Sequence, residues 1–117
     1  MNKISQLLKL NTRPLIMGVL NLTPDSFSDG GKYNEIDLAL KRVEYMIESG
    51  ADIIDIGAES SRPGAEIISV NDERDRLEPT LKEIKKAFDV PISIDTYKPE
   101  IMKLSIDYGV DMINDIY

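Results

Sequence analysis

The sequence predicts an α/β fold in which helices cover a parallel sheet. Two observations lead to this prediction: four short apolar runs alternate with three segments of helical periodicity, and each run is apolar nearly throughout. A chain of 117 residues with 42% hydrophobic residues can bury one core of ordinary domain size. We therefore expect a single domain over residues 1–117, with right-handed crossovers between consecutive strands.

The first strand is predicted at Leu15–Leu20, where branched apolar residues form a short run, and a long loop follows at Asn21–Asn34. From Glu35 to Ser49, apolar residues recur at three- and four-residue steps, which is typical of an amphipathic helix. Gly50 marks the end of this helix. The second strand is predicted at Ile53–Ile56.

A second loop, Gly57–Val70, leads into a helix that we predict from about Asn71 to Phe88. Pro79 lies inside this segment, and a proline there removes one backbone hydrogen bond and crowds the preceding turn. We therefore expect a bend or a break near Glu78.

The remaining elements are a strand at Ile92–Asp95, a helix at Pro99–Tyr108 and a strand at Met112–Asn114. Proline is favoured in the first turn of a helix, as at Pro99, and Gly109 is the next helix terminator. The chain ends soon after this strand without a helix to cover it, so we expect it to be part of a larger domain.

Composition excludes several classes of function. The net charge of −7 comes from intermixed acidic and basic residues, and no basic stripe for nucleic acid is present. No apolar run approaches the roughly 20 residues that span a bilayer, so we expect a cytoplasmic protein without a signal peptide or membrane anchor. The sequence contains neither cysteine nor histidine, which leaves carboxylates, amides, hydroxyls, Lys, Arg and Tyr for any chemistry.

Polar residues follow every predicted strand. In parallel α/β sheets, the carboxyl ends of the strands form the edge where ligands bind. Strand ends are also polar simply because loops begin there, but recurrence after all four strands favours a binding site. The residues concerned are Asn21, Asp55, Glu59–Arg62, Asp95, Thr96, Asn114 and Asp115.

Two of the connecting loops have features of ligand-binding loops. The first, Asn21–Gly31, is longer than the usual βα connection. The second, Glu59–Gly64, contains two hydroxyls and a guanidinium beside a Pro-Gly turn, which is suited to holding an anion such as phosphate. A surface salt bridge is the alternative explanation for Arg62.

Four segments occur in the order MGVLNLTPDSFSDGG (17–31), DIGAESSRPGA (55–65), SIDTYKPE (93–100) and INDI (113–116). Together they resemble the dihydropteroate synthase family, which belongs to the pterin-binding enzymes. The resemblance implies the N-terminal half of a (β/α)8 TIM barrel with four parallel strands and three helices. It also implies a folate-pathway transferase, the sulfonamide target, that condenses 6-hydroxymethyl-7,8-dihydropterin diphosphate with p-aminobenzoate to give 7,8-dihydropteroate and pyrophosphate.

The resemblance also assigns roles to single residues. Asn21 matches the asparagine that binds Mg²⁺, although a turn asparagine would look the same. Asp95 and Asn114 match pterin-binding positions, while helix capping is the alternative for Asp95. Arg62 matches an arginine near pyrophosphate, and Ser61 stands where the family commonly has threonine, which keeps the hydroxyl.

The roles of five further residues are less defined. Asp25, Phe27 and Asp29 lie in the first loop, which the resemblance suggests closes over the reacting groups. We expect Asp55 and Glu59 to be buried structural carboxylates without direct chemistry.

The family's site also uses an aspartate, a lysine and an arginine-histidine pair from later strands, so we expect this chain to be inactive by itself. The resemblance implies small-molecule substrates for the parent enzyme, which would be a homodimer. One alternative is a pterin-binding methyltransferase acting on methyltetrahydrofolate, which should lack the NLTPDSFSDGG loop. Another is an assembly unit that pairs its exposed strand edge with a second half-barrel.

Overall fold

The computed structural model describes residues 14–22, 32–58 and 67–114. Strands and helices alternate, and the sheet is parallel with the strand order β1-β2-β3-β4. None of the helices in this part of the chain is long and apolar enough to cross a membrane. The elements are β1 (Met17–Asn21), α2 (Lys32–Glu48), β2 (Ile53–Gly57), α3 (Val70–Ala87), β3 (Ile92–Asp95), α4 (Pro99–Asp107) and β4 (Met112–Asn114).

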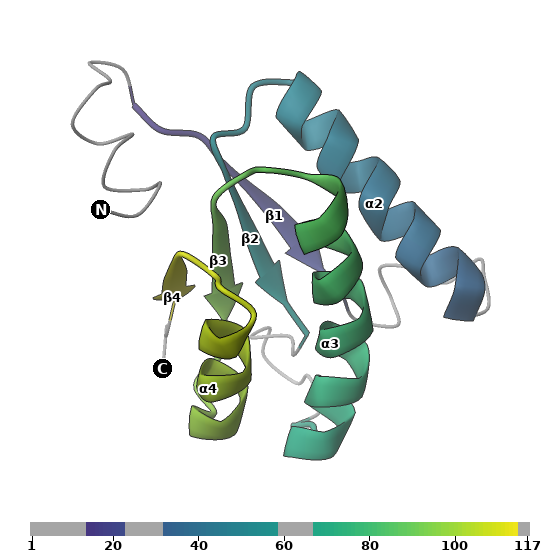
Figure 1. The fold of residues 1–117 in the computed structure, drawn as a ribbon, viewed down its shortest axis with the longest axis vertical. Coiled ribbons are helices and arrows are strands. Elements are labelled where there is room, and N and C mark those ends of the chain that lie inside the picture. Colours follow the sequence, from purple (N-terminus) through teal and green to yellow (C-terminus); the bar gives the residue numbers. More distant parts are fainter. Residues whose placement is uncertain (1–13, 23–31, 59–66, 115–117) are drawn as a thin grey trace.

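The helices lie along one side of the sheet (Figure 1). Strand side chains alternate between the two faces of a sheet, and the parallel register aligns the alternation from strand to strand. Leu20, Ile54, Ile56, Ile92 and Ile94 share one face and are almost completely buried in the core. The helices contribute Ala39, Val43, Leu77, Leu81, Ile84 and Ile101 to the same cluster.

The predicted fold class and every predicted element within the described residues are confirmed. Predicted β3 and β4 have the observed bounds, and the other elements differ by up to three residues at their ends. Of the two alternatives near Glu78, the break is wrong, because α3 continues through Pro79, whereas the bend stays a prediction. Proline removes only one N–H from the helix, and buried Leu77 and Leu81 on either side of Pro79 keep both halves of α3 on the core.

The two crossovers that end in β2 and β4 are built alike. After α2, Gly50 has a φ of 109° and its N–H donates to Ile47 O at 3.1 Å. After α4, Gly109 has a φ of 80° and its N–H donates to Ile106 O at 2.9 Å. A positive φ is readily accessible to glycine, which explains why this residue ends both helices.

Two residues after each of these glycines, an aspartate joins neighbouring strands. Asp52 N donates to Ile16 O at 2.7 Å, and Asp52 Oδ2 accepts from Ile16 N at 2.8 Å. In the same way, Asp111 N donates to Ile92 O at 2.9 Å, and Asp111 Oδ2 accepts from Ile92 N at 3.0 Å. Each aspartate therefore fixes the start of its own strand against the preceding strand, at the edge of the sheet opposite the strands' carboxyl ends.

We expect Asp111→Ala to destabilise the fold by about 1–3 kcal/mol, because it leaves the N–H of fully buried Ile92 without its acceptor. Asp107→Ala, at the exposed end of α4, is the matched control and should change stability by no more than about 0.5 kcal/mol. Urea denaturation of both variants checks this. Equal losses of stability would contradict the role given to Asp111.

Candidate functional site

The carboxyl ends of the strands bring three of the predicted site residues into one row. Asn21 pairs with Gly57, Gly57 with Asp95, and Asp95 with Asn114. All four residues occupy equivalent register positions, so the side chains of Asn21, Asp95 and Asn114 leave the backbone on the face of the sheet opposite the helices. The row therefore aligns an amide, a carboxylate and a second amide along one edge.

Gly57 leaves open the space between Asn21 and Asp95. Neighbouring strands are about 4.8 Å apart, which puts Asn21 and Asp95 roughly 10 Å from each other. A Cβ built on Gly57 would lie 3.4 Å from the Cβ of Asp95 and 3.5 Å from its Oδ2. A larger side chain at residue 57 would occupy the gap between the two polar groups.

The next row on the same face contains two buried polar residues. Asp55 pairs with Ser93 in the register and is 5% exposed, while Ser93 is fully buried. Burial raises the pKa of Asp55, and the nearby Ser93 hydroxyl and Asn114 side chain oppose this effect only in part. Among the described residues, Asp55 Oδ1 and Ser93 Oγ have no hydrogen-bond partner of acceptable geometry. Asp55 is therefore a buried carboxyl, as predicted.

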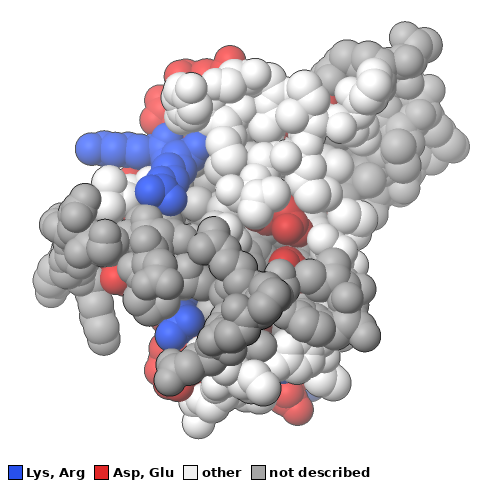
Figure 2. Space-filling model, turned by 180° about the vertical axis from the view of Figure 1, so that it is seen from behind, with Lys and Arg blue, Asp and Glu red and all other residues white. Residues whose placement is uncertain are grey.

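Figure 2 shows the molecule from the side opposite to that of Figure 1, where acidic atoms lie near the middle of the view beside uncharged side chains. At the β1 end of this face, Val19 is 57% exposed and Met17 is 38% exposed. The face thus combines polar groups at the carboxyl edge with apolar side chains further along β1.

The structure describes only some of the predicted site residues. Asn21, Asp95 and Asn114 lie together in the row described above, and Asp55 and Thr96 are described as well. The remaining predicted positions lie outside the described residues: Asp25, Phe27, Asp29, Glu59–Arg62 and Asp115.

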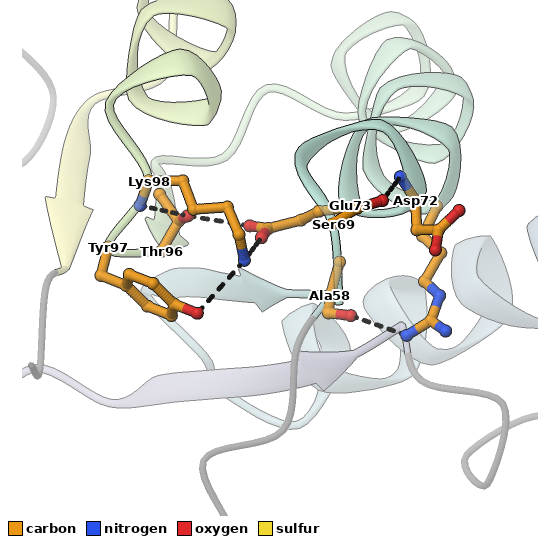
Figure 3. A network of polar contacts seen from close by, with 8 residues as sticks. Ala58, Ser69, Asp72, Glu73, Thr96, Tyr97 and Lys98 are labelled. Carbon is orange, nitrogen blue, oxygen red and sulfur yellow. Dashed lines mark hydrogen bonds and ion pairs between the residues drawn. The ribbon is translucent and has the colours of Figure 1, made fainter. Parts of the chain in front are cut away.

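A buried ion pair that the sequence did not predict lies between α3 and the segment after β3. Lys98 Nζ is 2.7 Å from Glu73 Oε1, and the two side chains are 10% and 2% exposed (Figure 3). The helical pattern contained a signal for Glu73, because this residue lies four positions before Leu77 on the inner face of α3. A charged residue at such a position needs a buried partner.

The residues at the edge are compatible with a magnesium ion that keeps few protein ligands. Among the described residues, no three His, Cys, Asp or Glu side chains gather into a metal-binding group. Asn21 is exposed and can offer one amide oxygen. Mg²⁺ often takes most of its ligands from water and substrate phosphates, so one amide suffices only where a phosphate also binds.

The sequence pattern of the pterin binding enzyme family matches residues 17–117. The dihydropteroate synthase of Clostridium beijerinckii is 56% identical over 108 residues, which are 92% of this chain and 40% of that protein. The crystal structure of the Clostridium difficile dihydropteroate synthase, solved with pteroic acid, has a TM-score of 0.87 and 47% identity over 91% of this chain and 40% of that one. The Xanthomonas albilineans enzyme, solved with 4-aminobenzoic acid, has a TM-score of 0.83 and 43% identity over 90% of this chain and 39% of that one.

The chain spans about 40% of the length of the relatives that it matches. Those relatives are TIM barrels, and the matched region is their N-terminal part. The four parallel strands and three helices thus form the predicted portion of a barrel. From the match over residues 17–117 and the shared fold, the chain belongs to the pterin binding enzyme family.

Proposed function

We propose that the chain supplies the first four strands of a dihydropteroate synthase. The whole protein would condense 6-hydroxymethyl-7,8-dihydropterin diphosphate with p-aminobenzoate to give 7,8-dihydropteroate and pyrophosphate, and would act as a homodimer. The observation that carries the proposal is the row of Asn21, Asp95 and Asn114 at the carboxyl edge of the sheet. The solved relatives that contain pteroic acid and 4-aminobenzoic acid support the choice of substrates.

The chemistry of the row suits one edge of a pterin ring. The Asp95 carboxylate can accept two hydrogen bonds, from the ring's amino group and from its N–H. The Asn114 amide, one strand away, can both donate and accept. Gly57 adds no side-chain atoms of its own beside Asp95, so a flat heterocycle can approach the backbone there.

Asn21, Ser61 and Arg62 would face the diphosphate. Arg62 would pair with phosphate oxygens, Ser61 would offer its hydroxyl, and Asn21 would hold Mg²⁺ through its amide oxygen. When bound, Mg²⁺ would neutralise charge on the departing pyrophosphate. The protein would hold the pterin and the diphosphate in fixed positions while the amine of p-aminobenzoate attacks.

The chain by itself would lack much of this site. It spans about 40% of its relatives' length, and the face that carries the row has partly exposed side chains such as Val19. Water at an open site weakens the electrostatic stabilisation of developing charge. We therefore propose that activity requires the rest of the barrel.

The full-length protein should release pyrophosphate from the pterin diphosphate only when p-aminobenzoate and Mg²⁺ are both present. The chain of residues 1–117 alone should give no measurable release, because its half-site is open to water. A coupled pyrophosphate assay on both proteins checks this. Methyl transfer from methyltetrahydrofolate by the full-length protein, without pyrophosphate release, would contradict the proposal.

In the full-length protein, Asp95→Asn should weaken binding of the pterin diphosphate by at least about tenfold, which corresponds to the loss of one hydrogen bond to a charged group. Calorimetric titration with Mg²⁺ present measures the affinity. Asp107→Asn, on the exposed end of α4, is the matched control and should bind like the wild type. If both variants bound equally well, Asp95 would not be a pterin ligand.

The raised pKa of Asp55 predicts a pH-dependent effect on stability. Above the usual carboxyl pKa of 3.8, the folded chain retains this proton while the unfolded chain has lost it, so stability falls as pH rises through the window up to the raised pKa. Asp55→Asn cannot ionise and avoids this loss. We therefore expect the variant to gain stability relative to the wild type as pH rises from the usual carboxyl pKa of 3.8 toward the raised pKa of Asp55.

Urea denaturation at several pH values measures the difference in unfolding free energy between Asp55→Asn and the wild type. Asp107→Asn serves as the exposed control. A difference for Asp55→Asn that stayed constant with pH would show that this carboxyl titrates alike in the folded and unfolded states.

A further inference from the structure

The first turn of α3 holds a carboxylate that contacts the segment after β3 through both of its oxygens. Glu73 Oε1 binds Lys98 Nζ at 2.7 Å, and Glu73 Oε2 accepts from the Thr96 hydroxyl at 2.8 Å. Glu73 is 1% exposed. In Figure 3 its side chain points from the helix toward Thr96 and Lys98. The carboxylate therefore has two partners in a dry environment, where such bonds are strong.

The contacted segment is also fixed internally. The Lys98 N–H donates to the Thr96 hydroxyl oxygen at 3.2 Å, so this hydroxyl both donates and accepts. Lys98 Nζ lies 4.4 Å from the centre of the Tyr97 ring, within the range of a cation–π contact. The residues 96–98 thus form one bonded unit with Glu73 (Figure 3).

Thr96 connects this unit to the row of site residues. It directly follows Asp95 at the end of β3, and its N–H donates to Asn114 O at 3.2 Å. A shift of Thr96 would therefore move the ends of β3 and β4 relative to each other. These are the two strands that carry the carboxylate and the amide proposed to bind the pterin.

The helix end that holds Glu73 is itself well anchored. The Ser69 side chain caps it by accepting from Asp72 N at 3.1 Å, and Ser69 O accepts from Glu73 N at 3.0 Å. One turn further along, Arg76 Nη1 donates to Ala58 O at 3.1 Å. The start of α3 therefore holds both the segment after β3 and the residue that follows Gly57.

We infer that Glu73 is a positioning residue for substrate binding, which acts through Thr96 to fix Asp95 and Asn114 relative to each other. The inference rests on the proposed function, because the pterin is taken as the ligand whose binding depends on the relative positions of Asp95 and Asn114. Neither Glu73 nor Thr96 needs to touch the substrate.

Thr96→Val is the most direct test, because valine keeps the shape of threonine but removes the hydroxyl that bonds Glu73 and Lys98. Thr96→Ser keeps the hydroxyl and removes only the methyl group. Ser105→Ala is the matched control, since it removes a buried hydroxyl that donates only within α4, to Ile101 O at 2.8 Å. The affinity of each full-length variant for pterin diphosphate is measured by calorimetry with Mg²⁺ present, beside its thermal midpoint.

Thr96→Val should weaken binding roughly 10- to 100-fold, the range expected when binding groups are displaced by a fraction of an ångström to 1 Å. Thr96→Ser and Ser105→Ala should keep the wild-type affinity, although Ser105→Ala lowers the thermal midpoint. If Thr96→Val does not fold, Glu73→Gln replaces it in the same comparison. Its control is Glu83→Gln, which alters an exposed ion pair between Glu83 and Lys86.

Two results would overturn the inference, and they are distinguishable. Wild-type affinity in Thr96→Val or Glu73→Gln, with normal binding by the wild type, would refute the positioning role alone. A full-length wild type that does not bind the pterin diphosphate would refute the proposed function and this inference with it.

Discussion

The in-register parallel pairing of β1 to β4 is the constraint on which the candidate site depends. Because strand side chains alternate with a period of two, a slip of one residue in any strand would turn its polar end residue toward the helices. At the opposite edge of the sheet, Asp52 fixes the register of β2 on β1 and Asp111 fixes that of β4 on β3. Each does so through one backbone N–H and one side-chain oxygen. The geometry of the row is thus set at the far ends of the strands as well as at the site.

Much of the fold could be predicted from local patterns in the sequence. Short apolar runs predicted the strands, and Gly50 and Gly109 predicted the helix ends. The structure shows why these two glycines mark helix ends, since each adopts a positive φ. The pattern around Pro79 could not exclude a break, because the cost of proline in a helix is local, whereas the burial of Leu77 and Leu81 on the core is a tertiary effect that offsets it. Tertiary packing of this kind is not visible in a local pattern.

The candidate site was predictable in part for the same reason. Asn21, Asp95 and Asn114 could be grouped because each follows a strand, and parallel strands end at one edge. The pairing of Glu73 with Lys98 was not predictable, because the two residues are 25 positions apart and no spacing rule joins a helix to a later loop. Only the buried position of a charged residue on α3 indicated that a partner was required.

The buried ion pair of Glu73 and Lys98 suits a role in positioning the segment after β3. Removing a carboxylate and an ammonium group from water is costly, and well-packed apolar residues of similar size often stabilise a fold as well or better. A hydrophobic pair, however, would tolerate sliding, whereas Glu73 holds Lys98 and Thr96 through directional bonds of 2.7 and 2.8 Å. Directional bonds specify where the segment after β3 lies, and that segment directly follows Asp95. Stability alone does not account for a buried charge pair beside the carboxyl edge of the sheet, but a need to hold that edge in one arrangement does.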